Sequence, residues 1–335
     1  MSAGAYKCTL RARRHRADTV PVAGNNVRRP ATSCKNAALA SAARQLRPPP
    51  PLSSPQKPLM NLDTLAPWIA QHPTTLWLWG MALCAMLGSL ALQGLRALRH
   101  QQSPLRRWLH PVSPAALLVM AMAVAACALL AGGAVLAALA ESGQATGTWG
   151  RVDEAIAHQL RTQASLGDLR WFATLTHLGD SWVLAALTVV VTMALWWRKH
   201  RLLAVGWLVA MAGNGLLTKI LKDVFARVRP EHVHGAAQAD GFSFPSGHSS
   251  ASIVAYAMLA YLAVRLLPRR WHQPAACTAG ALIFTTGFSR VVLHVHYASD
   301  VLAGWLLGGT WMVCTVLIMD SMARWRGAPP ALARQ

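Results

Sequence analysis

The chain has 335 residues, of which 54% are hydrophobic and only 13% are charged, and its formal net charge is +20. Soluble domains carry about 25% charged residues, so this composition excludes an ordinary soluble protein and favours a membrane protein. The positive charge does not indicate a nucleic-acid partner. Half of it lies in residues 1–59, and the rest is spread over short loops, as the positive-inside rule expects.

Residues 1–59 are rich in Arg, Ala, Ser and Pro and show no apolar periodicity. A segment of this kind cannot bury enough apolar surface to form a core, so it is predicted to be a disordered basic tail.

Seven apolar runs follow, each about long enough to cross a membrane as a helix. They are predicted at 74–95, 114–139, 181–197, 202–221, 249–267, 274–292 and 300–319. Residues 141–178 are more polar and have a helical period, so we expect an interfacial helix or a helix pair outside the hydrocarbon. The predicted fold is an all-α, polytopic membrane helical bundle.

Loop charge predicts the topology. The basic loops at 96–107, 198–201, 269–270 and 324–326 are expected in the cytoplasm. Alternation then places 141–178, 222–248 and 290–300 together on the opposite side, where cations are disfavoured and therefore suggest function: Lys222, Arg227, Arg229 and Arg290.

The same alternation puts the basic tail outside, which conflicts with its charge. A chain that starts at Met60 removes the conflict, so we favour residues 1–59 not being translated over an error in the first crossing.

The first polar cluster contains Lys222, Arg229 and Pro230. Seven residues are two helical turns, so Lys222 and Arg229 are predicted to point the same way and could grip a phosphate. The alternative is ordinary snorkelling of two cations to the interface.

The second cluster is Pro245-Ser246-Gly247-His248, directly before an apolar run. Ser246 can cap the helix, and Gly247 lets a ligand approach the backbone. Free N–H groups at a helix start form an anion site, and His248 could donate a proton there. The alternative is a plain helix cap beside an interfacial histidine.

The third cluster contains Ser289, Arg290, His296 and Asp300. On a helix, the Asp300 carboxylate can reach the His296 imidazole four residues away and fix its tautomer. His294 is followed at the same distance by an alanine, so the spacing selects His296. The alternative is a structural hydrogen bond, but ionisable groups near membrane spans are functional candidates by default.

Written together, the pattern Lys-x6-Arg-Pro, Pro-Ser-Gly-His and Ser-Arg-x5-His-x3-Asp resembles the type 2 phosphatidic acid phosphatase (PAP2) superfamily. That family includes lipid phosphate phosphatases and vanadium haloperoxidases. The resemblance covers about 114–319 and implies a six-helix core, with the run at 74–95 as an extra N-terminal helix. The expected division is a tail at 1–59, the extra helix and a basic loop at 60–112, a catalytic membrane domain at 113–320 and a cytoplasmic tail at 321–335.

The resemblance also implies roles for the residues. His296 is the expected nucleophile that forms a phosphohistidine, Asp300 orients it, and His248 protonates the leaving oxygen and then activates water. The phosphate oxygens would be held by Lys222, Arg229, Ser246, Gly247 and Arg290. No metal or cofactor is expected.

The expected function is hydrolysis of a lipid phosphate or diphosphate, with undecaprenyl diphosphate as the first choice on family resemblance. Phosphatidylglycerol phosphate, phosphatidic acid and lipid A remain alternatives, as do phosphotransfer, a haloperoxidase and a non-enzymatic lipid transporter. The expected location is the bacterial inner membrane, with the site facing the periplasm or exterior. The oligomeric state is not indicated.

Overall fold

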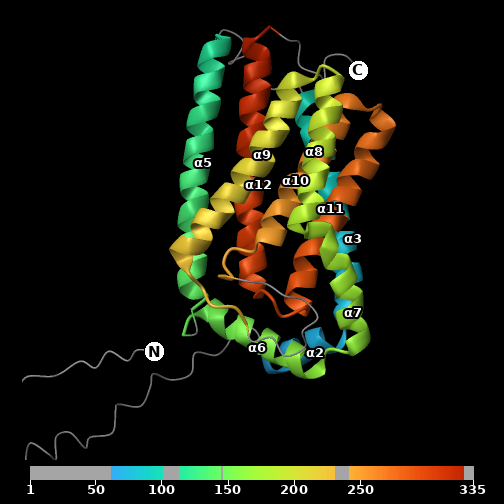
Figure 1. The fold of residues 1–335 in the computed structure, drawn as a ribbon, viewed down its shortest axis with the longest axis vertical. Helices are drawn as coiled ribbons and strands as arrows, with labels where there is room; N and C mark the ends of the chain where they lie inside the picture. The colour runs from blue at the N-terminus through green and yellow to red at the C-terminus, as the bar shows by residue number, and fades with distance from the viewer. Residues whose placement is uncertain (1–61, 101–112, 145, 231–240, 328–335) are drawn as a thin grey trace, which may run out of the picture. The chain divides into compact units, whose positions relative to one another are not determined.

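The computed structural model describes residues 62–100, 113–144, 146–230 and 241–327 (Figure 1). The predicted tail at 1–59, most of the loop at 96–107 and the last eight residues lie outside this range.

The described residues form helices and contain no β-strand. The elements are α2 (Leu62–Gln71), α3 (Pro73–His100), α5 (Pro114–Ser142), α6 (Thr148–Gln163), α7 (Leu166–Leu175), η1 (Thr176–Gly179), α8 (Ser181–Trp197), α9 (Arg201–Phe225), α10 (Gly247–Leu266), η2 (Arg269–Trp271), α11 (His272–Val292) and α12 (Ala298–Trp325).

Seven helical segments are long and apolar enough to cross a membrane, as the sequence predicts. The apolar windows of α3 and α5 are each only 6% buried within the protein, so most of their hydrophobic surface is available to lipid. In water such surface would be strongly unfavourable, which is why these helices require a bilayer. The protein is therefore an integral membrane protein with an all-α fold.

The segment at 141–178 does form the predicted helix pair, α6 and α7, but the two helices differ in character. α6 is polar and lies across one end of the long helices (Figure 1). α7 instead belongs with η1 and α8 to one 32-residue candidate span, Leu166–Trp197. At 1.5 Å per residue this span is about 48 Å long, more than the hydrocarbon thickness of about 30 Å, so part of it extends beyond the hydrocarbon. The excess of about 18 Å is longer than the ten residues of α7, so the expectation that 141–178 lies outside the hydrocarbon stays a prediction.

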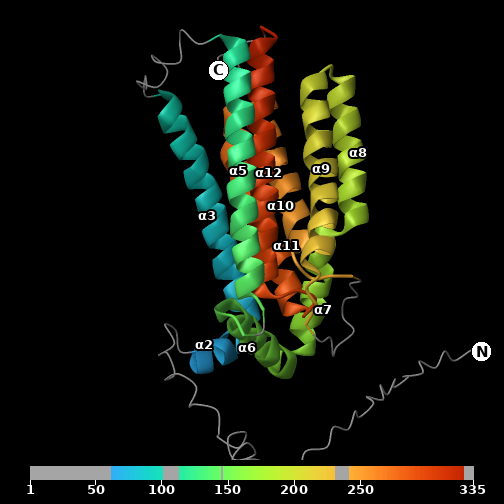
Figure 2. The same cartoon turned by 90° about the vertical axis from the view of Figure 1, so that its left-hand side faces the viewer.

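The long helices pack around α10, which contacts α9, α11 and α12, while α5 lies along α12 and α3 along α11 (Figure 2). A core between α8, α9, α10 and α12 contains Leu195, Trp207, Met258 and Met319, all buried. Close packing of this kind drives helix association in a membrane, where burial from water is not available.

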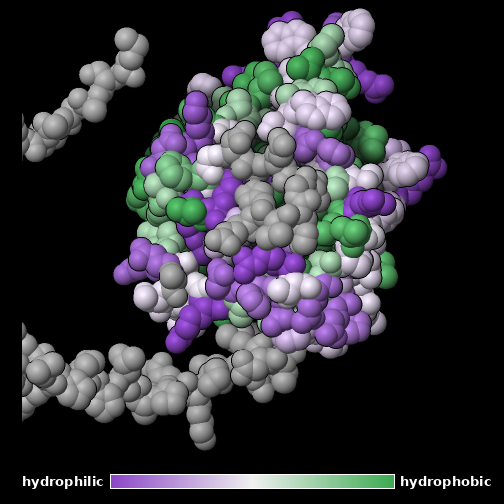
Figure 3. All heavy atoms as spheres, turned by 60° about the horizontal axis from the view of Figure 1, so that its bottom comes forward, coloured by the Kyte–Doolittle hydropathy of each residue, from purple (hydrophilic) through white to green (hydrophobic). Residues whose placement is uncertain are grey.

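The ends of four helices meet at the end of the bundle where α6 lies. These are the C-terminal ends of α9 and α11 and the N-terminal ends of α10 and α12 (Figure 2). Viewed toward this end, hydrophilic side chains gather on the surface, and hydrophobic ones lie toward its sides (Figure 3). The fold therefore brings the three polar clusters of the sequence to one end of the membrane helices.

Candidate active site

Each predicted cluster occupies a helix terminus at this end. Lys222 lies in the last turn of α9, Ser246 caps α10, and Arg290 lies in the last turn of α11. His296 immediately precedes α12, and Asp300 lies in its first turn.

His296 and Asp300 contact each other, although not for the reason that their spacing suggested. α12 begins only at Ala298, so His296 lies outside the helix. Asp300 turns back toward the chain before the helix: its Oδ2 accepts the Tyr297 backbone N–H at 2.9 Å and lies 3.4 Å from His296 Nδ1. A capping interaction, rather than a helical turn, therefore brings the carboxylate to the imidazole.

The contact made by the other ring nitrogen, Nε2, identifies the tautomer of His296. Arg229 Nη1 lies 3.1 Å from His296 Nε2, and a guanidinium can only donate, so Nε2 must be the acceptor. The ring proton is then on Nδ1, where it is donated to Asp300. Nε2 is left with its lone pair directed at the cationic side of the site.

Burial lowers the pKa of His296 to about 3, and the charges of Arg229 and Arg290 act in the same direction, while Asp300 opposes them. The imidazole is 3% exposed. It is therefore neutral at pH 7, which is the form a nitrogen nucleophile requires.

The predicted alignment of Lys222 and Arg229 on one helix is wrong. α9 ends at Phe225 because Ala226 adopts a left-handed conformation (φ 45°) that stops the helix, and Arg229 lies in the following irregular segment. Arg229 is instead positioned by donating to the Val295 carbonyl at 2.7 Å. Arg229, Arg290 and Asp300 lie near enough to Lys222 for their charges to act on it, so Lys222 remains a candidate for the same site.

Ser246 caps α10 as predicted. Its buried hydroxyl oxygen accepts the backbone N–H of Ser249 at 3.4 Å and the Ser249 hydroxyl at 2.9 Å. Gly247 is the first residue of α10, so the free N–H groups of that helix start lie beside the cap.

His248 has a carboxylate partner that sequence reasoning missed. Its Nε2 lies 3.0 Å from Asp180 Oδ1, and Asp180 Oδ2 lies 2.7 Å from His177 Nδ1. Asp180 precedes α8 and is 68 residues from His248. No spacing rule could have joined the two, because their contact depends on how η1 packs against α10.

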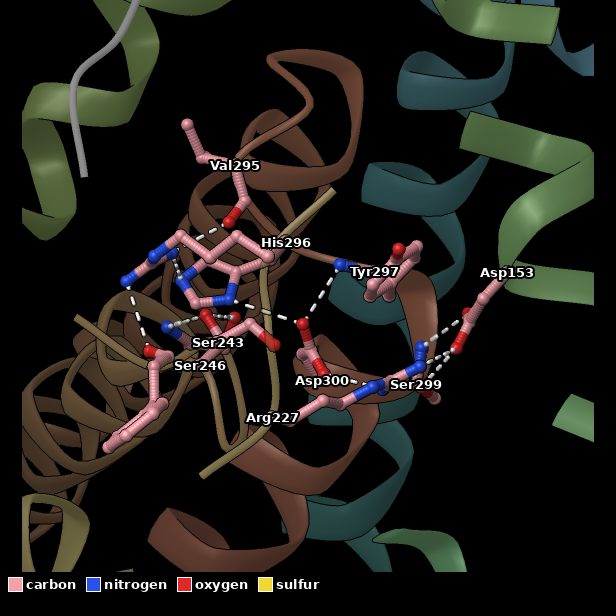
Figure 4. Close-up of polar contacts among 12 residues, drawn as sticks. Asp153, Arg227, Ser243, Ser246, Val295, His296, Tyr297, Ser299 and Asp300 are labelled. Carbon is pink, nitrogen blue, oxygen red and sulfur yellow. Dashed lines mark hydrogen bonds and ion pairs between the residues drawn. The ribbon is translucent and has the colours of Figure 1, made fainter. Parts of the chain in front are cut away.

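Arg290 is also held from the preceding part of the chain. It is 3% exposed, and its Nη1 donates to Thr176 Oγ1 at 2.8 Å. Asp153 was missed as well, and Arg227 was singled out only as a cation on the disfavoured side of the membrane, without a role in the site. Arg227 binds Asp300, and Asp153 binds Arg227 (Figure 4).

No group of three or more His, Cys, Asp or Glu side chains is placed to hold a metal ion within the described part of the chain. The positive charges that act on His296 are those of Arg229 and Arg290, and the charges of both also act on Lys222. A neutral histidine facing several cations suits the binding and transfer of a phosphoryl group.

Comparison with protein families gives one match relevant to this site. Residues 203–323 match the model of the PAP2 superfamily. The matched range includes all eight predicted site residues, whereas Asp153, Thr176 and Asp180 precede it.

Three relatives illustrate the range of similar proteins. The chain is 35% identical to phosphatidylglycerophosphatase B of Bacillus subtilis over 136 residues, which are 40% of this chain and 66% of the relative. It is 32% identical to lipid A 1-phosphatase of Rhizobium etli over 134 residues, 36% of this chain and 54% of the relative. It is 30% identical to decaprenylphosphoryl-5-phosphoribose phosphatase of Mycobacterium tuberculosis over 145 residues, 41% of this chain and 72% of the relative. The chain thus spans slightly less than two thirds of the first relative and about half of the second.

Among solved structures, the chain resembles a transmembrane PAP2 type phosphatidylglycerolphosphate phosphatase from Bacillus subtilis. The TM-score is 0.51 and the identity is 30%, and the match covers 57% of this chain and 93% of that one.

Proposed function

The chain belongs to the PAP2 superfamily, and from this membership and the geometry of the site we propose that it is a membrane lipid phosphatase. The observation that carries the proposal is the state of His296. Its neutral ring is held by Asp300 through Nδ1 and directs the Nε2 lone pair toward Arg229.

In the first step, His296 Nε2 attacks the phosphorus atom, and the bond from phosphorus to the lipid oxygen breaks. Bound phosphate takes up the N–H donors of Arg229 and so releases the His296 lone pair that Arg229 contacts. His248 gives a proton to the leaving oxygen. The product is a phosphohistidine whose ring is positively charged and faces Asp300.

In the second step, water attacks the phosphorus atom and gives a proton to His248, and the P–N bond breaks to release inorganic phosphate. The non-bridging oxygens are held by Lys222, Arg229, Arg290, Ser246 and the Gly247 N–H. Donors that are already positioned where negative charge gathers are the main source of rate enhancement in phosphoryl transfer.

The substrate class is a phosphate or diphosphate group on a lipid. The names of the relatives refer to phosphatidylglycerophosphate, lipid A and a decaprenylphosphoryl phosphoribose, which differ in head group and tail. What they share is a phosphate group on a lipid, and an integral membrane fold suits a substrate whose tail stays in the bilayer. Undecaprenyl diphosphate is the first candidate for a substrate panel, followed by phosphatidylglycerophosphate, phosphatidic acid and lipid A.

The orientation is also a proposal. The turns at 198–201, 269–270 and 324–326 are basic and lie at the opposite end from the site, which supports a site facing the periplasm or exterior of a bacterial inner membrane. A reporter fused after Gln335 should then be active only as a cytoplasmic reporter. Activity of a periplasmic reporter at this position would reverse the orientation.

The test of function is phosphate release by the purified full chain in detergent. His296→Ala should abolish release from every lipid that the wild type hydrolyses, and an acid-labile phosphoryl label should be found on His296 of the wild type. His158→Ala, which removes an exposed histidine of α6, is the matched control and should retain activity. Full activity of His296→Ala would disprove the nucleophile, and no release by the wild type from the whole panel would disprove the function.

A further inference from the structure

The Arg227 side chain connects several polar groups beside His296, the proposed nucleophile (Figure 4). Its Nη1 donates to Asp300 Oδ1 and to Ser299 Oγ, both at 2.7 Å, and its Nη2 donates to the Gly143 carbonyl at 2.7 Å and to Asp153 Oδ2 at 3.0 Å. One guanidinium thus ties the turn after α5, the helix α6 and the start of α12 together. The guanidinium can make these contacts together because its N–H donors have a fixed planar geometry, whereas the single ammonium group of a lysine cannot.

Asp153 is the far end of this chain of contacts. It is 1% exposed, and besides the Arg227 contact it accepts the Ser299 backbone N–H at 3.1 Å and the Ser299 hydroxyl. Burial raises the pKa of the Asp153 carboxyl, while the donors Ser299 and Arg227 oppose the rise. Every group that contacts Asp153 is a donor, so the geometry fits the ionised carboxylate.

The distances show which group holds Asp300. Asp300 lies 2.7 Å from Arg227 but 3.4 Å from His296, so the arginine is its closer partner. If Arg227 and Asp300 were alone, their charges would cancel, and little negative charge would face His296. Asp153 adds a second negative charge, so the three groups together carry a net charge of −1.

That net charge is relevant to the chemistry, because the His296 ring becomes positive as Nε2 bonds to phosphorus. At this buried position a nearby negative charge interacts more strongly than it would in water. The same contacts also keep Asp300 from rotating away from the ring.

We propose that Asp153 is a positioning residue for the phosphoryl transfer: acting through Arg227, it holds Asp300 in place and leaves a net negative charge facing His296. The proposal rests on the proposed function. It assigns a role to α6, which precedes the part of the chain that matches the family model.

The test compares Asp153→Asn, Arg227→Gln, the double variant and Arg227→Lys in the purified full chain, with dioctanoyl phosphatidic acid as the probe. Asp153→Asn and Arg227→Gln should each lower kcat about 10- to 100-fold while KM changes by less than about twofold, because positioning affects the reacting state and not uniform binding. The double variant should be no slower than Arg227→Gln alone, because Asp153 acts through Arg227. Asp168→Asn is the matched control, since this acid is half-buried in the first turn of α7 and contacts Ser165 at the start of that helix.

Arg227→Lys keeps the positive charge and covers the case in which Asp153→Asn does not fold. It should give an intermediate kcat, and wild-type kcat in this variant would overturn the proposal. So would losses in the double variant that multiply, or a folded Asp153→Asn with wild-type kcat.

A second readout separates this inference from the proposed function. Orthovanadate bound to a histidine nitrogen is five-coordinate and mimics the transition state of phosphoryl transfer. It should therefore raise the unfolding temperature of the wild type and Asp168→Asn more than that of Asp153→Asn, without any lipid turnover. Equal vanadate shifts in all three proteins would overturn the role of Asp153. A wild type that releases no phosphate from any lipid would instead disprove the function.

Discussion

Replacing Gly304 by alanine tests whether the close approach of α10 and α12 positions the site. A Cβ at Gly304 would lie 2.6 Å from the Ser246 carbonyl oxygen and 2.9 Å from the Ser249 Cβ. Since ordinary contact begins at 3.4 Å, the start of α10 would have to move by about 0.8 Å (3.4 − 2.6). Ser246 donates its backbone N–H to the Asp300 carbonyl at 3.0 Å, so this movement separates Ser246 and Gly247, the proposed phosphate-binding residues of α10, from Asp300. Because a misplacement of about 1 Å can cost about 100-fold in rate, we expect kcat to fall by up to about 100-fold.

The assay is phosphate release from the best lipid of the panel, together with the unfolding temperature in detergent. Overpacking at Gly304 should also cost about 1–3 kcal/mol of stability. Gly309→Ala is the matched control on the same helix, because its Cβ would meet only the end of the Ile253 side chain, at 3.3 Å. A folded Gly304→Ala protein with wild-type kcat would refute the argument that this helix contact sets the site geometry.

Three further predictions concern protons and metals. Asp180 contacts His248, so Asp180→Asn should lower kcat about 10- to 100-fold for a lipid phosphate. The loss should be smaller for p-nitrophenyl phosphate, because its leaving group needs no proton from His248. Equal losses for the two substrates would contradict the role of Asp180. The His296 pKa of about 3 lies below the unfolded value of 6.5, so the unfolded chain binds an extra proton in acid, and stability is lost as pH falls below 6.5. This amounts to about 3 kcal/mol between pH 7 and pH 4, and thermal unfolding of His296→Gln should show a shallower pH dependence. EDTA followed by dialysis should leave phosphate release unchanged, because no metal-binding group is found within the described part of the chain; a loss that Mg²⁺ restores would be evidence against this expectation.

Much of the fold follows from the sequence because membrane helices are encoded locally. A run of about 20 apolar residues must satisfy its own backbone hydrogen bonds in the bilayer, so length and composition are sufficient to find it. The seven spans were predicted on this basis. The length of the third span was not predicted, because α7 follows the polar α6, whereas its buried Leu169 and Phe172 make it part of an apolar span with α8.

The site was predictable where its residues lie close in sequence or at a helix end. Ser246 could be identified as a cap from its position before an apolar run, and the four-residue spacing selected His296. The same reasoning failed for Lys222 and Arg229, since a left-handed residue at Ala226 ends the helix between them. A backbone conformation of that kind is not visible in the hydrophobic pattern.

The sequence by itself determined the class of protein, the seven spans and the eight candidate site residues, which all belong to one family pattern. Only the tertiary structure showed which further carboxylates hold the side chains of the site. Asp180 reaches His248 and Asp153 reaches Arg227 only after α6, η1 and α8 pack against the ends of α9, α10 and α12. These contacts join residues 68 and 74 positions apart, and no periodicity of a helix reaches so far.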